Sequence, residues 1–411
     1  MTRHPTVLIE MSTLSKKYRY KSKTLDRLGV RSWINARNWT SAIGSAWIDD
    51  RVLAAMNEAS RTFVDMHELF ARADMKIAEL CRVEDAHVTS GAGAAITLAV
   101  AACMAGDDFA KWQKLPFTQG MQNEIIFPRG HYQAYTPQWT SAGAKLVEYG
   151  QVGMLKSFKR ELESAITERT CCLAYTLSYN TTPRGNIPIE EVIEAGKKYD
   201  IPVIFDAAAL LPPVDNLYKF TDMGADIVIF SGGKGIRSIA SSGMMLGRGC
   251  GTEIVNAVRN HTYPHEGWAR GFKVSKEQII GLVTALEIFI KEGDSQYDRQ
   301  METARYLQKE LSEVQDLDVQ IIRNDETCHE HPVVPHVPRV LVQWDLQKVK
   351  ITAEALDQAM AAEDPPIFLK ERHYHNYYTN KAWRIIDTYF LREGEERIVA
   401  ERFKKIMIGS T

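Results

Sequence analysis

Residues 225–243 read ADIVIFSGGKGIRSIASSG and place a single lysine, Lys234, in a glycine-rich turn directly after an apolar run. The run is short and rich in β-branched and aromatic residues, which is typical of a buried strand. A lysine in such a turn can hold a phosphate, form a covalent bond, or lie on a surface loop. Which of these roles Lys234 has depends on the residues that the fold brings beside it.

Short apolar runs recur between about residues 60 and 260, and each is followed by turn residues and then by helical periodicity. Examples are NEIIFPRG at 123–130, CCLAYTLSYN at 171–180 and IPVIFDAAA at 201–209. Apolar runs of this length that alternate with helices indicate βαβ units. The sequence therefore predicts an α/β fold with a mostly parallel sheet covered by helices on both faces.

The composition excludes several classes of function. The 411 residues are 45% hydrophobic and 25% charged, and 50 basic against 52 acidic residues give a formal net charge of −2. This balance offers no electrostatic footprint for nucleic acid. The longest apolar stretch, 92–106, is shorter than the roughly 20 residues of a membrane span. Six cysteines without a CxxC pair indicate a reducing compartment, so we expect a cytoplasmic protein with no membrane segment.

Two phosphate-binding motifs can be tested against the sequence. A P-loop requires a glycine five residues before its Gly-Lys pair and a Ser or Thr after the lysine. Here Val228 and Gly235 stand at those positions, so the motif fails. SGAGAAI at 90–96 opens a helix as a dinucleotide fingerprint does, but Ile96 replaces the third glycine and no acidic residue follows at the required distance. One feature of the motif is still present, because the amino end of a helix after a glycine-rich turn binds anions.

Pyridoxal phosphate needs a lysine, a carboxylate for its ring nitrogen and a cradle for its phosphate. Lys234 and Asp206 each follow a predicted strand, and the turn at 90–94 follows a third. The carboxyl ends of parallel strands meet at one edge of a sheet, so these three parts converge. The residues therefore favour pyridoxal 5'-phosphate as the cofactor, with Lys234 as the Schiff-base lysine and later the proton carrier at the substrate's Cα.

Several longer segments carry a family resemblance, among them VTSGAGAAITLAVAACMAGDD at 88–108, YNTTPRGNIPIEEVIEAGKKYDIPVIFDAAALLPPVDNL at 179–217 and GADIVIFSGGKGIRS at 224–238. Over nearly its whole length the chain resembles the fold-type-I pyridoxal-phosphate enzymes. It is most similar to the group of D-glucosaminate-6-phosphate ammonia-lyase and bacterial selenocysteine synthase. The resemblance implies a seven-stranded type of sheet and three parts: an N-terminal arm with a small-domain segment (1–59), a large cofactor-binding domain (60–265), and a connecting helix with a C-terminal small domain (266–411).

The resemblance also implies residue roles. Lys234 would bond to the cofactor, Asp206 would pair with the ring nitrogen, and His131 would stack on the ring. Asn180 would hydrogen-bond the ring hydroxyl, although a turn-forming asparagine is an equal alternative. The phosphate would be held by Ser90, Ala92, Gly93, Ala94 and Ser231.

The substrate side departs from the group's pattern. The group usually has Gly-Pro-Gln after the lysine turn, where residues 238–240 are Ser-Ile-Ala, and it lacks the arginine and tryptophan of NARNWTS at 35–41. Lys370 stands near the position of the group's carboxylate-binding arginine. Arg37 and Arg372 are the candidate substrate-binding residues, because a guanidinium grips a carboxylate with two hydrogen bonds. We therefore assign no particular substrate.

We expect an enzyme that acts at Cα of an amino acid or amino acid derivative by α,β-elimination, as an ammonia-lyase does. A racemase or epimerase is the alternative, and a non-catalytic binding protein of the same fold or a nicotinamide dehydrogenase are weaker ones. The resemblance implies a homodimer or higher homo-oligomer with a small-molecule substrate, and the balanced charge argues against a nucleic-acid partner. CHEHPVVPH at 328–336 holds metal-capable side chains, but its prolines and spacing favour a loop, so we expect no metal.

Overall fold

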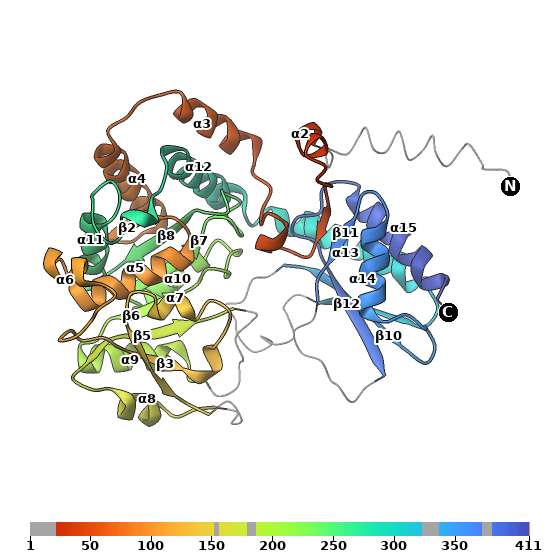
Figure 1. Cartoon of the computed structure of the whole chain (residues 1–411). Helices are drawn as coiled ribbons and strands as arrows, with labels where there is room; N and C mark the ends of the chain where they lie inside the picture. The colour runs from red at the N-terminus through yellow and green to blue at the C-terminus, as the bar shows by residue number, and fades with distance from the viewer. Residues whose placement is uncertain (1–21, 152–155, 179–185, 323–336, 372–379, 411) are drawn as a thin grey trace. The chain divides into compact units, whose positions relative to one another are not determined.

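The computed structural model describes residues 22–151, 156–178, 186–322, 337–371 and 380–410, and they form two compact units (Figure 1). The larger unit takes its residues from 45–294. The smaller unit combines 22–44 with 295–322, 337–371 and 380–410. Among the described helices, none combines the length and apolar content that crossing a membrane requires.

A mixed sheet of seven strands forms the centre of the larger unit, in the order β2-β8-β7-β6-β5-β3-β4. Four neighbouring pairs are parallel and two are antiparallel, because β8 runs against both β2 and β7. The predicted α/β class with a mostly parallel sheet is thus confirmed. The strands are β2 (Asp85–Thr89), β3 (Glu124–Pro128), β4 (Lys145–Tyr149), β5 (Thr170–Thr176), β6 (Val203–Asp206), β7 (Ile227–Ser231) and β8 (Gly243–Gly247).

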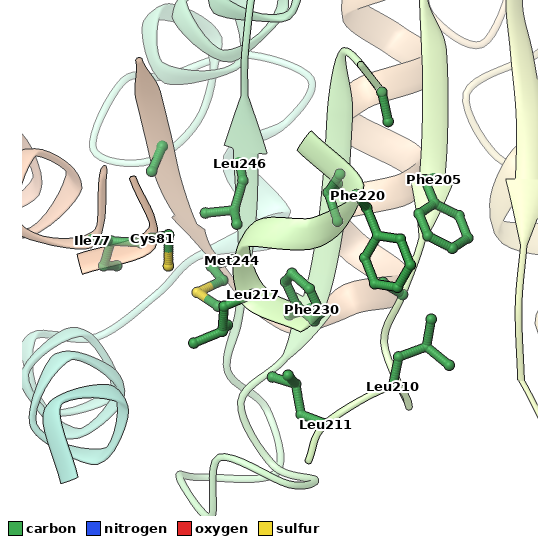
Figure 2. Close-up of a cluster of buried hydrophobic side chains, with 14 of the residues drawn as sticks. Ile77, Cys81, Phe205, Leu210, Leu211, Leu217, Phe220, Phe230, Met244 and Leu246 are labelled. Carbon is green, nitrogen blue, oxygen red and sulfur yellow. The ribbon is translucent and has the colours of Figure 1, made fainter. Parts of the chain in front are cut away.

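Helices cover both faces of this sheet, since successive residues of a strand point to opposite sides. Tyr175 and Phe205 pack with α4, α9, α10 and α12, and Figure 2 shows Phe205 beside Phe220 in that core. Ala174 and Ile204 pack on the other face with α5, α6, α7 and α11. The helices are α3 (Asp50–Ser60), α4 (Met66–Cys81), α5 (Ala92–Ala105), α6 (Phe109–Lys114), α7 (Pro137–Thr140), α8 (Lys159–Ala165), α9 (Ile189–Tyr199), α10 (Asn216–Met223), α11 (Gly251–His261) and α12 (Lys276–Glu292).

Two helices beyond the predicted large domain, 60–265, belong to the larger unit. α12 begins with a capping box, in which Ser275 accepts the N–H of Gln278 and the Gln278 side chain accepts the N–H of Ser275. α3 packs against α12, and Arg51 of α3 forms an ion pair with Glu292 of α12 at 2.7 Å. α12 also packs against α4, so these contacts tie residues 45–59 and 266–294 to the large sheet.

The smaller unit is built on an antiparallel sheet in the order β12-β10-β9, with a separate parallel pair β1-β11. A buried ion pair joins neighbouring strands, since Arg339 of β10 binds Asp387 of β12 at 2.6 Å. The elements of this unit are α2 (Lys23–Arg27), β1 (Ile34–Ala36), η1 (Ser41–Ile43), α13 (Gln296–Ser312), β9 (Leu317–Ile322), β10 (Arg339–Asp345), α14 (Ala353–Ala362), β11 (Ile367–Leu369), β12 (Lys381–Asp387) and α15 (Glu395–Ile408).

Candidate active site

Three polar side chains stand at the carboxyl ends of three neighbouring strands of the large sheet. Thr176 ends β5, Asp206 ends β6 and Ser231 ends β7. Thr176 and Asp206 are register partners, and Ser231 lies two residues beyond Ile229, the partner of Asp206. Residues two apart on a strand face the same side, so all three side chains leave the sheet on one face. This edge is where α/β sheets bind their ligands.

Asp206 is a buried carboxylate, with 5% of its surface exposed. Its Oδ1 accepts the backbone N–H of Ala208 at 3.0 Å. Burial raises the pKa of Asp206, and the positive charge of Lys234 opposes this rise. A buried carboxylate is stabilised as an anion by a cationic partner. The protonated nitrogen of a pyridine ring would be such a partner.

Lys234 lies in the turn that follows β7 and interacts electrostatically with Asp206. Burial lowers the pKa of Lys234, and attraction to Asp206 opposes part of this effect. The Nζ atom lies 5.8 Å from the ring centroid of Tyr135, a half-exposed side chain. A lowered pKa makes the amine neutral in a larger fraction of molecules near pH 7, which favours its use as a nucleophile or base.

The turn that carries Lys234 is fixed by backbone bonds and close packing. The N–H of Ser238 donates to the carbonyl of Gly232 at 2.8 Å, which closes the turn. A Cβ atom on Gly235 would overlap the carbonyl oxygen of Leu211. Glycine is therefore required beside the lysine for the backbones to approach one another. The apolar strand and the glycines thus explain why Lys234 stays at this edge.

The amino end of α5 is open to an anion. Its N-cap, Gly91, has φ +108° and no side chain that could accept the first N–H groups of the helix. Gly243 pairs with both Thr89 and Ser231, on the strands either side of β8, and a Cβ on it would lie 2.7 Å from the carbonyl carbon of Gly91. Uncapped helix amino ends attract phosphate. The predicted phosphate ligands here are Ser90, Ala92, Gly93 and Ala94, all partly exposed.

His131 is fully buried in the short helix η2 (Arg129–His131) that follows β3. Its Nδ1 accepts the backbone N–H of Thr176 at 3.1 Å, and its ring meets the edge of Tyr175 at 4.6 Å between centroids. Since Nδ1 accepts, a neutral ring carries its proton on Nε2. The sequence did not single out Thr176 or Tyr135. A polar residue that ends an apolar strand was the available signal for Thr176.

The remaining predicted residues lie either outside the described ranges or in the smaller unit. Asn180, Arg372 and the segment 328–336 lie outside the described residues. Arg37 lies in the smaller unit, where its guanidinium pairs with Glu371 at 3.4 Å and stacks on Phe368 at 4.8 Å from the ring centroid. Within the part of the chain that the structure describes, no group of three or more His, Cys, Asp or Glu side chains could hold a metal ion.

The arrangement of strands and helices in the larger unit is that of the fold-type-I pyridoxal-phosphate enzymes. Residues 51–337 match the family model described as aminotransferase class-V, and the chain belongs to this family. It is accordingly an enzyme that depends on pyridoxal phosphate. The buried carboxylate, the neighbouring lysine and the uncapped end of α5 fit the three polar demands of that cofactor.

Two curated proteins and one solved structure define the similarity further. A 5'-C-glycyluridine monooxygenase-decarboxylase of Streptomyces sp is 31% identical over 355 residues, which cover 85% of this chain and 84% of that protein. The D-glucosaminate-6-phosphate ammonia lyase of Salmonella typhimurium is 32% identical over 265 residues, which cover 64% of this chain and 68% of that protein. A solved structure of D-glucosaminate-6-phosphate ammonia-lyase matches with a TM-score of 0.78 at 26% identity, covering 95% of this chain and 99% of that one. The predicted resemblance is confirmed.

Proposed function

We propose that Lys234 and Asp206 are the two residues that hold the reactive part of pyridoxal phosphate. Lys234 would bond to the aldehyde carbon, and Asp206 would pair with the ring nitrogen. The observation that carries this proposal is the charge interaction between the two residues at one edge of the sheet. Burial raises the pKa of Asp206 and lowers that of Lys234, and each residue's charge opposes the shift of the other. A bound cationic ring would supply the charge that the buried Asp206 lacks.

The rest of the proposed site follows from its surroundings. The amino end of α5, with Ser90, Ala92, Gly93 and Ala94, would bind the phosphate together with Ser231. His131 would stack on the pyridine ring. The N–H of Thr176 fixes the imidazole through Nδ1, and an imidazole that accepts there is neutral. Asn180 remains the proposed partner of the ring hydroxyl.

When bound, pyridoxal phosphate supplies an electron sink for a bond broken at the substrate's Cα. The residues of this chain do the rest. Lys234 accepts the Cα proton as a neutral amine, which its lowered pKa favours. Asp206, whose Oδ1 accepts the N–H of Ala208, would pair as an anion with the ring nitrogen. The turn at residues 232–238 fixes the backbone that carries this lysine.

The reaction that we propose is α,β-elimination, with ammonia and a 2-oxo acid as products of an amino acid that carries a β leaving group. Its support is the similarity to D-glucosaminate-6-phosphate ammonia-lyase in sequence and in structure. Elimination needs a single base at Cα, and Lys234 provides it. Racemisation would need a second acid on the opposite side of Cα.

A second candidate is an oxidative decarboxylation at Cα. The Streptomyces relative, whose name joins a monooxygenase to a decarboxylase, matches a larger share of both chains than the curated lyase does. The two reactions give different products. Incubation in D₂O with L- and D-amino acids, with and without β-hydroxyl or phosphorylated groups, separates them. Ammonia with a 2-oxo acid supports elimination, carbon dioxide with oxygen uptake supports the second candidate, and a deuterated antipode without ammonia supports a racemase.

We also propose the cellular setting and the assembly. The neutral charge balance and the free cysteines among the described residues fit a cytoplasmic enzyme. A homodimer or higher homo-oligomer is proposed from the family resemblance. The division into 1–59, 60–265 and 266–411 is proposed on the same ground, with residues 45–59 and 266–294 packed as parts of the larger unit. Arg37 and Arg372 are the proposed carboxylate-binding residues, and Arg37 would have to exchange Glu371 for the substrate.

A further inference from the structure

Thr176 occupies a position beside Asp206 that the roles above do not explain. Its register partner across the parallel pair β5-β6 is Asp206. Ala174 and Ile204, two residues earlier on each strand, pack in the core that contains α5. Residues two apart share a face of the sheet, so the side chains of Thr176 and Asp206 lie side by side on the α5 face.

The hydroxyl of Thr176 is buried and has no hydrogen-bond partner among the described residues. The residue is 1% exposed, so water does not replace that partner. Other buried threonine hydroxyls of this unit are paired: Thr97 donates to the carbonyl of Gln138 and Thr221 to that of Tyr218, both at 2.9 Å. An unpaired buried hydroxyl destabilises the folded protein, and it is expected where a ligand completes the bond.

The position of Thr176 decides which part of a ligand can hydrogen-bond its hydroxyl. Ser231 lies two strands away, on β7, which is about 10 Å at the usual strand spacing. A phosphate held by Ser231 and the amino end of α5 therefore leaves the edge at β5 and β6 to the ring. Thr176 also holds His131 through its backbone N–H. Its side chain thus lies between the two residues proposed to pair with the ring nitrogen and to stack on the ring.

We propose that Thr176 is a further cofactor-binding residue. Its hydroxyl would hydrogen-bond a polar atom of the pyridine ring on the side next to Asp206. The inference rests on the proposed function of the site. It has a testable consequence. The hydroxyl should strengthen cofactor binding, but it should destabilise the cofactor-free protein, in which it has no partner. A valine, which has the same shape, removes the hydroxyl and leaves the backbone bond to His131 in place.

The test compares Thr176→Val with Thr176→Ser and with the control Thr221→Val. The cofactor is removed from each purified protein, the melting temperature is measured, and pyridoxal phosphate is titrated back to obtain its dissociation constant and the absorption spectrum of the bound form. For Thr176→Val we expect an unchanged or higher melting temperature without cofactor. We also expect a dissociation constant raised about 3- to 10-fold, the range of one neutral hydrogen bond. Thr176→Ser should bind within about twofold of the native protein, because it keeps the hydroxyl.

Thr221→Val should show the reverse pattern, a lower melting temperature with an unchanged dissociation constant, because its hydroxyl is paired within the protein. The inference is wrong if Thr176→Val follows that control pattern, if it fails to fold, or if it binds the cofactor as tightly as the native protein. A native chain that binds no pyridoxal phosphate would instead contradict the proposed function itself. The two failures are therefore distinguishable.

Discussion

The backbone N–H of Thr176 donates to Nδ1 of His131 at 3.1 Å, and both residues are buried. This bond links the end of β5 to the short helix after β3, two neighbouring strands of the large sheet. It also leaves the proton of a neutral imidazole on Nε2. The ring that is proposed to stack on the cofactor is therefore held by the same strand that ends beside Asp206.

His131→Phe tests that link. Phenylalanine preserves an aromatic ring but cannot accept the N–H of Thr176, and an orphaned buried donor costs about 1–3 kcal/mol. We expect the free energy of unfolding of the cofactor-free protein to fall by that amount in urea titrations. Cofactor affinity should fall less than in His131→Ala, which removes the ring as well. Equal affinity in the two variants would show that ring stacking does not contribute.

Asp206→Asn tests the electrostatic half of the site. The amide keeps the size of the side chain but not its charge, so the ring nitrogen loses the anion that favours its protonated form. Exchange of the substrate's Cα proton for deuterium should slow by several orders of magnitude, while the circular dichroism spectrum stays native. Exchange at the native rate would mean that Asp206 only caps a strand.

Lys234→Met tests the burial of the amine in the cofactor-free protein. The pKa of Lys234 is lowered from about 10.5, so the unfolded chain binds more protons than the folded one between the lowered pKa and 10.5, and stability rises with pH in that window. Methionine removes the cost of the buried charge. The variant should be more stable than the native protein near neutral pH, and this gain should shrink as the pH approaches 10.5.

The measurement is urea unfolding of both proteins across that range. A gain that does not change with pH would assign the effect to packing alone. A native protein that is the more stable one at neutral pH would show that attraction to Asp206 outweighs burial, the reverse of the expected sign.

Gly235→Ala tests the packing of the lysine turn. The new Cβ would overlap the carbonyl oxygen of Leu211, and such overpacking costs about 1–3 kcal/mol. We expect a lower free energy of unfolding and weaker binding of the cofactor. Gly271→Ala is the matched control, because a Cβ there meets no atom within 4 Å. The two variants should differ clearly in thermal melts, and equal melting temperatures would contradict the described turn.

Part of this site could be predicted from the sequence because parallel strands end at a common edge. The apolar runs before Asp206 and Lys234 place both residues there, and the glycine turn at 90–94 opens a helix in the same region. The register could not be predicted in the same way. That Thr176 faces Asp206 depends on how β5 and β6 align, and that Tyr135 approaches Lys234 depends on the path of a loop. Pairing and loop path are tertiary properties, which local residue patterns do not determine.

The direction of β8 and the partner of Arg37 also could not be predicted from the sequence. SSGMMLGRG indicates a strand at 241–249, but its antiparallel direction follows from the short connection after the lysine turn. Arg37 reads as a free cation for a substrate carboxylate, whereas in the structure it binds Glu371 and Phe368. Glu371 is distant in sequence, so only the pairing of β1 with β11 brings the two together.

The central claim is that Lys234 carries pyridoxal phosphate in a covalent bond, and borohydride reduction tests it most directly. The purified protein, incubated with pyridoxal phosphate, should turn yellow and lose that absorbance on reduction. Peptide mapping should then find the cofactor on the peptide that contains Lys234, and Lys234→Ala should bind the cofactor weakly with no label. A protein that takes up no cofactor, or a label on a different lysine, would contradict the account.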